Sequence, residues 1–167
     1  MKGARLMRVI SAVTLALLVC AVTGCSGHKQ TIITKGGAAT VETNQTNDTT
    51  TITTNQGTAV VGKNAVDLSK LDVPVYPGAS SESGGLSVQS NEGNQQIATL
   101  TTSDSFDKVY DWYKNHMPAS SEKLHMTSGG SSMAQFAIGT ETDKRFKSVM
   151  ITQATGKTAI QIVVGSK

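Results

Sequence analysis

The sequence has 167 residues, with 15 lysine and arginine residues against 12 aspartate and glutamate residues. Three of the basic residues, Lys2, Arg5 and Arg8, lie in an N-terminal segment with the pattern of a cleaved export signal. Cleavage before Cys25 leaves 143 residues, in which 12 basic side chains balance 12 acidic ones. Nucleic-acid binding depends on a net basic surface that neutralises phosphates, so this balance argues against nucleic acid as a partner.

The predicted signal has a basic start (1–8) and an apolar centre (9–22). The centre is short for a membrane-spanning helix, which needs about 20 residues, and polar residues follow from Ser26 onward. We therefore expect residues 1–24 to be removed. Cys20 leaves with them, so Cys25 is the one remaining cysteine and an intrachain disulfide is excluded.

The end of the signal, Val22, Thr23, Gly24 and Cys25, resembles the lipobox of bacterial lipoproteins. The resemblance implies that a diacylglycerol is attached to the Cys25 sulfur and that the freed amino group is often acylated, for example with palmitate. Two or three acyl chains hold a protein stably at a membrane, because each buried methylene contributes about 0.8 kcal/mol. Ser26 after the cysteine implies transfer to the outer membrane, facing the periplasm, in an organism that has one. Otherwise the anchor lies on the outer face of the cytoplasmic membrane.

Residues 25–72 form a polar stretch rich in Thr, Asn and Gly. Two interpretations remain open for it. Such a composition buries little apolar surface and is typical of a solvated tether. However, residues 31–41 align with residues 51–61, and each copy reads as strand, glycine turn, strand, with Gly37 and Gly57 at the turns. This weak repeat favours a pair of β-hairpins.

Residues 73–167 are predicted to form a globular α+β domain, which begins at a segment with two prolines and Tyr76. Apolar and polar residues alternate in several short runs separated by turn residues, which indicates sequential antiparallel strands. Ile160, Ile162 and Val164 share one face of the clearest run. The expected sheet has about six strands and one helix packed on one face, preceded by the tether or hairpins. The predicted strands are 86–90, 96–102, 123–127, 133–139, 147–153 and 158–164.

One segment has helical periodicity, with Asp104 as the expected N-cap and Asp107 in the first turn. His116 and Pro118 mark its end. The apolar stripe of this helix consists of Phe106, Val109, Tyr110, Tyr113 and Met117.

Residues 73–164, from the Tyr-Pro-Gly-Ala entry to the last strand, resemble a small domain found in bacterial envelope lipoproteins without an assigned activity. The resemblance rests on this entry and on residues 104–114. It implies no catalytic residue.

Three motifs that suggest chemistry have simpler explanations. Gly156, Lys157 and Thr158 resemble the end of a phosphate-binding loop, but that motif needs a glycine where this chain has Ile151, so a hairpin turn is expected. The three carboxylates spaced along the predicted helix fit an N-cap and a solvated face better than an acid–base pair. His28, His116 and His125 lack metal-ligand spacing. We therefore predict no catalytic residue, metal or other cofactor.

Trp112 lies beside Lys108 and off the apolar stripe of the helix. Packing against the sheet edge would explain it, and an exposed Trp112 would mark a binding patch. The sequence thus predicts a monomeric, lipid-anchored envelope protein that contacts another envelope component without catalysis. The alternative is a small-ligand-binding or enzymatic domain with a pocket between helix and sheet.

Overall fold

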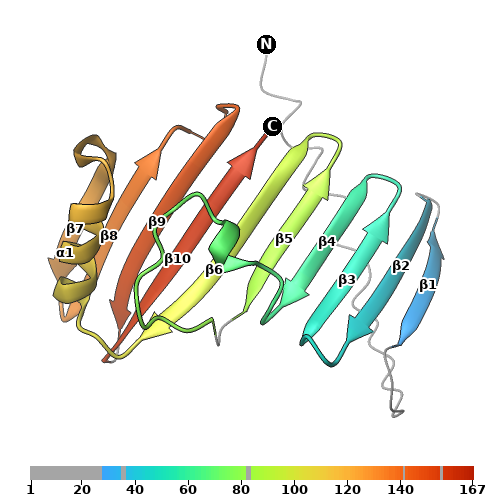
Figure 1. Cartoon of the computed structure of the whole chain (residues 1–167), viewed down its shortest axis with the longest axis horizontal. Helices are drawn as coiled ribbons and strands as arrows, with labels where there is room; N and C mark the ends of the chain where they lie inside the picture. The colour runs from blue at the N-terminus through green and yellow to red at the C-terminus, as the bar shows by residue number, and fades with distance from the viewer. Residues whose placement is uncertain (1–27, 35–36, 82–83, 141, 155) are drawn as a thin grey trace.

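The computed structural model describes residues 28–34, 37–81, 84–140, 142–154 and 156–167, so the predicted signal, the lipobox and Cys25 lie outside the described residues. The described chain forms an antiparallel sheet of ten strands with one α-helix, α1 (Phe106–His116), packed against it (Figure 1). The strands are β1 (Lys29–Thr34), β2 (Gly37–Asn44), β3 (Thr49–Thr54), β4 (Gly57–Gly62), β5 (Gly85–Ser90), β6 (Gly93–Thr102), β7 (Glu122–Ser128), β8 (Ser131–Ile138), β9 (Arg145–Ala154) and β10 (Lys157–Ser166).

The order of strands across the sheet is β1-β2-β3-β4-β5-β6-β10-β9-β8-β7. Each strand from β2 to β6 pairs with the strand before it. After β6 the chain passes through α1 to the far edge and returns strand by strand, until β10 lies beside β6 (Figure 1). This path leaves β1 and β7 as the two edges of the sheet.

The six predicted strands are confirmed as β5 to β10, but the expected strand number is too low. The polar segment before them contributes four more strands, because its two hairpins pair with each other and β4 pairs with β5. Strand β5 provides the edge on which the two hairpins assemble. Isolated hairpins are marginal in water and gain stability by extending a sheet. A Cβ on Gly57 would lie 2.1 Å from the carbonyl oxygen of Gln89, so β4 can begin this close to β5 only with glycine there.

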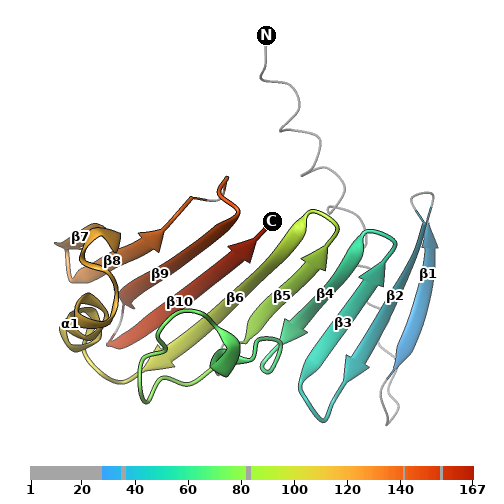
Figure 2. The ribbon, with the colours of Figure 1, turned by 45° about the horizontal axis from the view of Figure 1, so that its top comes forward.

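The hydrophobic core lies on one face of β6, β8, β9 and β10, which we call the covered face. Two elements cover it, namely α1 near the β7 edge and the segment 63–81 over the middle of the sheet (Figure 2). Ile160 and Ile162 are fully buried there, as their alternation predicted. The other sheet residues of the core are Ala98, Leu100, Ala134, Phe136, Val149 and Ile151.

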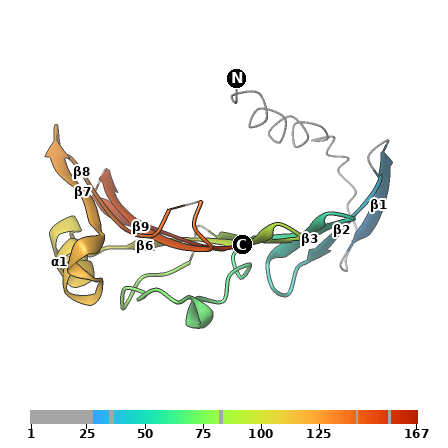
Figure 3. The same ribbon diagram turned by 90° about the horizontal axis from the view of Figure 1, so that it is seen from above.

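The segment 63–81 lies on the same side of the sheet as α1 and contains a short 3-10 helix, η3 (Leu68–Lys70) (Figure 3). Val73 and Tyr76 of the predicted proline-rich entry are buried in the core. Asp72 also forms an ion pair with Lys147 of β9. This segment therefore contributes to the core of the C-terminal strands.

The predicted helix is confirmed, but its N-cap is Ser105 and not Asp104. The Ser105 hydroxyl accepts a hydrogen bond from the backbone nitrogen of Lys108. Asp104 is unsuited to the cap because its carboxylate already accepts hydrogen bonds from the Tyr76 hydroxyl at 2.7 Å and from the Lys108 ammonium group at 2.9 Å. Because of these contacts, the N-cap lies one residue after the predicted position.

Leu100 is fully buried, whereas its neighbour Thr99 points to the opposite face of the sheet. We expect Leu100→Ala to lower the free energy of unfolding by about 2–5 kcal/mol, because it removes apolar contacts and leaves a cavity. Chemical denaturation measures this loss. Thr99→Ala is the matched control and should change stability by less than about 1 kcal/mol. Equal losses for the two variants would contradict the assignment of the covered face.

Candidate functional site

The face of the sheet opposite α1, which we call the open face, is the most extensive surface that no described segment covers. The register of the paired strands shows which residues lie on the open face, because directly opposite residues share a face. Thr99 and Gln161 are paired across β6 and β10 on this face, next to the buried pair Leu100 and Ile160 on the covered face. Both ends of the sheet turn away from the side that carries α1, so the open face is concave (Figure 3).

Charged side chains are almost absent from the strands on the open face. Within the ten described strands, the register places one there, Lys157 at the start of β10, apart from Lys123 at an irregular position of β7. The covered face, by contrast, carries Lys29, Glu42 and Lys147 outside its buried core. Depletion of charge from a solvent-accessible patch is a compositional feature of protein interfaces.

Apolar side chains form two rows across the open face, because residues directly opposite each other in neighbouring strands share a face. The first row is Val41, Ile52, Ala59 and Val88, from β2 to β5, and the second is Val61, Leu86, Ile97 and Val163, from β4 to β10.

A third apolar group lies at the β7 end of the same face. Methionine is flexible and polarizable, and it is common at binding surfaces. Met126 lies opposite Met133, and Met126 and Leu124 are exposed. Met150 of β9 is one strand further along the open face.

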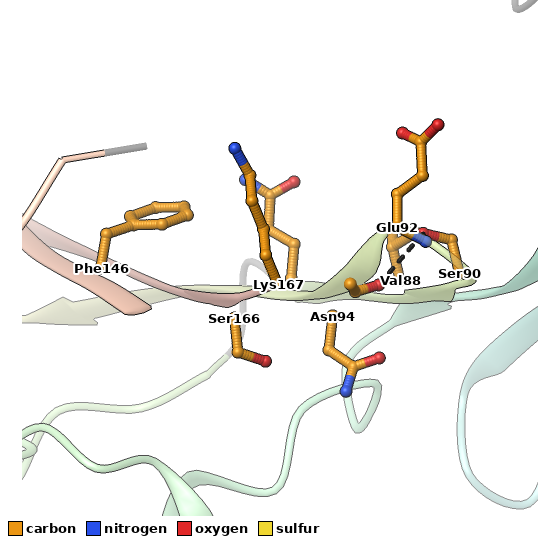
Figure 4. A pocket seen from close by; sticks show the side chains of 9 residues that line it. Val88, Ser90, Glu92, Asn94, Phe146, Ser166 and Lys167 are labelled. Carbon is orange, nitrogen blue, oxygen red and sulfur yellow. Dashed lines mark hydrogen bonds between the residues drawn. The ribbon is translucent and has the colours of Figure 1, made fainter. Parts of the chain in front are cut away.

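Phe146, the second residue of β9, lies on this face near one end of its strand, where its ring covers Gly165 of the neighbouring strand β10. A Cβ at Gly165 would lie 2.0 Å from a ring carbon of Phe146, so glycine is required for this contact. Two shallow depressions of about 300 Å³ each border the ring. One contains Glu92 and Lys167, whose side chains extend to the same side of the sheet as the Phe146 ring (Figure 4).

The predicted patch of Trp112 and Lys108 lies on α1, on the other side of the sheet. Trp112 is half-buried, with its ring stacked on His116 at 4.1 Å and edge-on to Tyr76 at 5.4 Å. Lys108 is paired with Asp104. Trp112 therefore contacts the core, and its role in binding stays a prediction.

The other candidate groups lie apart. His125 stacks on Tyr110 at 4.0 Å, whereas His116 contacts the Trp112 carbonyl oxygen at 2.7 Å. Among the described residues, no three His, Cys, Asp or Glu side chains are grouped so that they could hold a metal ion. Gly156 lies between β9 and β10, directly before Lys157 at the start of β10, where a hairpin was predicted.

The described residues contain no helix of sufficient length and apolar character to cross a membrane. A scan of protein-family models, a search of curated proteins and a search of solved structures each found no match to the chain.

The two donors to Asp104, Lys108 first and Tyr76 second, hold the pKa of this carboxyl group below its ordinary value of 3.8. A carboxylate with a lowered pKa in the folded state stabilises the protein above the pKa of the unfolded chain and loses this effect as pH falls through the lowered value. Wild type should therefore be more stable than Asp104→Asn above about pH 5, and the difference should shrink below about pH 4.

Denaturation curves of both proteins between pH 2 and pH 7 measure this difference. The same comparison in a Lys108→Met background is the control and should show a weaker pH dependence, because the donor that lowers the pKa of Asp104 most is gone. A wild-type advantage that is unchanged from pH 7 to pH 2 would contradict the role of Asp104.

Proposed function

We propose that this chain is a lipid-anchored protein of the bacterial cell envelope that acts as a non-catalytic binding module through its open sheet face. The observation that carries the binding role is the register, which leaves the strands of the broad concave face almost without charge while they bear apolar rows and methionines. Such a surface offers van der Waals contacts and neutral hydrogen bonds to a partner at little cost of charge desolvation.

The anchor is supported by the sequence from Val22 to Cys25. Small residues before the cysteine suit a chain that lies extended in a protease cleft, and the thiol supplies the atom to which diacylglycerol is attached. With two or three acyl chains, attachment needs no basic patch. Ser26 favours the outer membrane, facing the periplasm, in an organism that has one.

The depression beside Phe146 supports a second candidate function, the binding of a small ligand. Glu92, Lys167 and Gln95 line it together with the aromatic ring. A pocket between helix and sheet has less support, because the fully buried side chains of Phe106, Tyr113 and Phe136 occupy that interface. The shallow, open shape of the Phe146 depression favours a large partner over a small enclosed ligand.

Cys25→Ser should abolish incorporation of labelled palmitate and leave residues 1–24 attached, because the acceptor sulfur is lost. Metabolic labelling and intact mass measure the two effects. Cys20→Ser is the matched control, since this cysteine lies inside the removed segment and labelling should be unchanged. Labelled Cys25→Ser protein would overturn the anchor.

A photoreactive amino acid at position 88 should give a discrete cross-linked product in intact envelopes, because Val88 lies on the open face. The same probe at position 89 is the control, since Gln89 points to the other face. In the position-88 protein, Ile97→Lys should lower the yield about tenfold, which corresponds to about 1.4 kcal/mol for a charge buried in the contact. Equal products from positions 88 and 89 would contradict the open face as the binding surface.

A further inference from the structure

The two edges of the sheet differ in their protection against pairing with another strand. Natural proteins guard exposed edges with bulges, charges or proline. At the β7 edge, the register shifts between Glu122 and Leu124, and Lys123 lies at the irregular position. At the β1 edge, pairing with β2 is regular over Lys29–Thr34, and this segment has no proline and one charge, at its first residue.

The hydrogen-bond pattern identifies the backbone groups of β1 that face outward. The Thr43 nitrogen donates to the His28 oxygen at 3.1 Å, so this directly opposite pair is a hydrogen-bonded one. Bonded and non-bonded pairs alternate along antiparallel strands. Lys29, Thr31 and Ile33 therefore direct their N–H and C=O groups away from β2, and no described strand pairs with β1 on that side. The side chain of Ile33 is also 85% exposed.

We propose that the outer edge of β1 pairs with β1 of a second copy of this chain. The inference rests on the proposed function, because the lipid anchor brings the copies together. In an antiparallel pair, each outward-facing residue of one copy lies opposite an outward-facing residue of the other. Two registers satisfy this rule with the greatest overlap of the two strands. Either Thr31 or Ile32 then lies opposite the same residue of the second copy.

Both registers join the two sheets with their open faces on the same side, because directly opposite residues share a face. The pairing is also compatible with charge, since the two Lys29 side chains lie at opposite ends of the paired strands. Ile33 moves from solvent into contact with the second copy. A second β1 is thus complementary to the edge in hydrogen bonding, charge and apolar contact.

A pair of six-residue strands buries too little surface for a stable dimer in dilute solution. Confinement to a membrane raises the effective concentration of the partner and favours such weak contacts. Cys25 is four residues before Lys29, so the anchor lies within about 14 Å of the start of β1. Pairing is therefore expected on the membrane, whereas the dispersed protein is monomeric.

Cysteine cross-linking of the full lipidated protein in phosphatidylethanolamine–phosphatidylglycerol vesicles tests this pairing. The acylated Cys25 has no free thiol, so Thr31→Cys and Ile32→Cys each add a single reactive group. At least one of them should form a disulfide dimer on mild oxidation, because directly opposite residues lie within disulfide range. Ile52→Cys is the matched control, since Ile52 is 36% exposed and Ile32 38%, but β3 is an interior strand. The dimer yield should exceed the control at least tenfold and should fall to the control level in excess detergent.

A backbone variant separates edge pairing from mere proximity. In the Ile32→Cys protein, if that variant forms the dimer, Thr31→Pro removes an outward N–H without loss of a β1–β2 hydrogen bond and should abolish the dimer, whereas Thr31→Ala should retain it. If Thr31→Cys is the variant that forms the dimer, Ile33→Pro and Ile33→Val are the corresponding pair, because Ile33 also directs its N–H outward. Two outcomes would overturn the pairing alone. In one, the protein floats with the vesicles but gives no more dimer than Ile52→Cys. In the other, the β1 cysteine forms its disulfide with Met126→Cys of β7 instead of with β1. Protein that does not float would overturn the anchor, and the pairing with it.

Discussion

The structure depends on the burial of one face of β6, β8, β9 and β10 beneath α1 and the segment 63–81. This contact contains nearly all of the large buried side chains, among them Leu100, Phe136 and Tyr113. None of the described segments covers β1 to β4 in a comparable way, and these strands are held mainly by backbone hydrogen bonds to the next strand. Their order therefore follows from the presence of β5 at the boundary of the core, which gives them an edge to extend.

This arrangement divides the sheet into a packed region and a single-layer region. In the packed region, aromatic residues of α1 fill the space over β8 and β9. Asp104, just before the helix, accepts a hydrogen bond from the Tyr76 hydroxyl. In the single-layer region, threonines and valines expose both faces, because β-branched residues favour extended backbone even with little burial. Stability should accordingly be concentrated at the C-terminal strands.

The distribution of charge connects the fold to the proposed function. Ion pairs such as Asp72 with Lys147 lie on the side of α1, where they surround the core. The strands of the open face carry apolar rows and neutral polar residues, and the Phe146 ring covers Gly165 near one end of β9. A partner on the open face and a second copy at β1 would make separate contacts, since one uses side chains of a face and the other uses backbone groups of an edge.

The sequence by itself determined the elements whose signals are local. The apolar stripe from Phe106 to Met117 requires a helix, and alternation such as Ile160, Gln161 and Ile162 requires strands. It also carried the motif at Cys25. Tertiary structure decided the rest, since pairing between distant segments is not encoded in local periodicity. It joined β1 to β4 to the sheet and moved the helix cap to Ser105. It also decided which face α1 covers. The open face, whose strands carry few charges, could not be identified from the sequence, because alternation within a strand separates two faces but does not say which of them is buried.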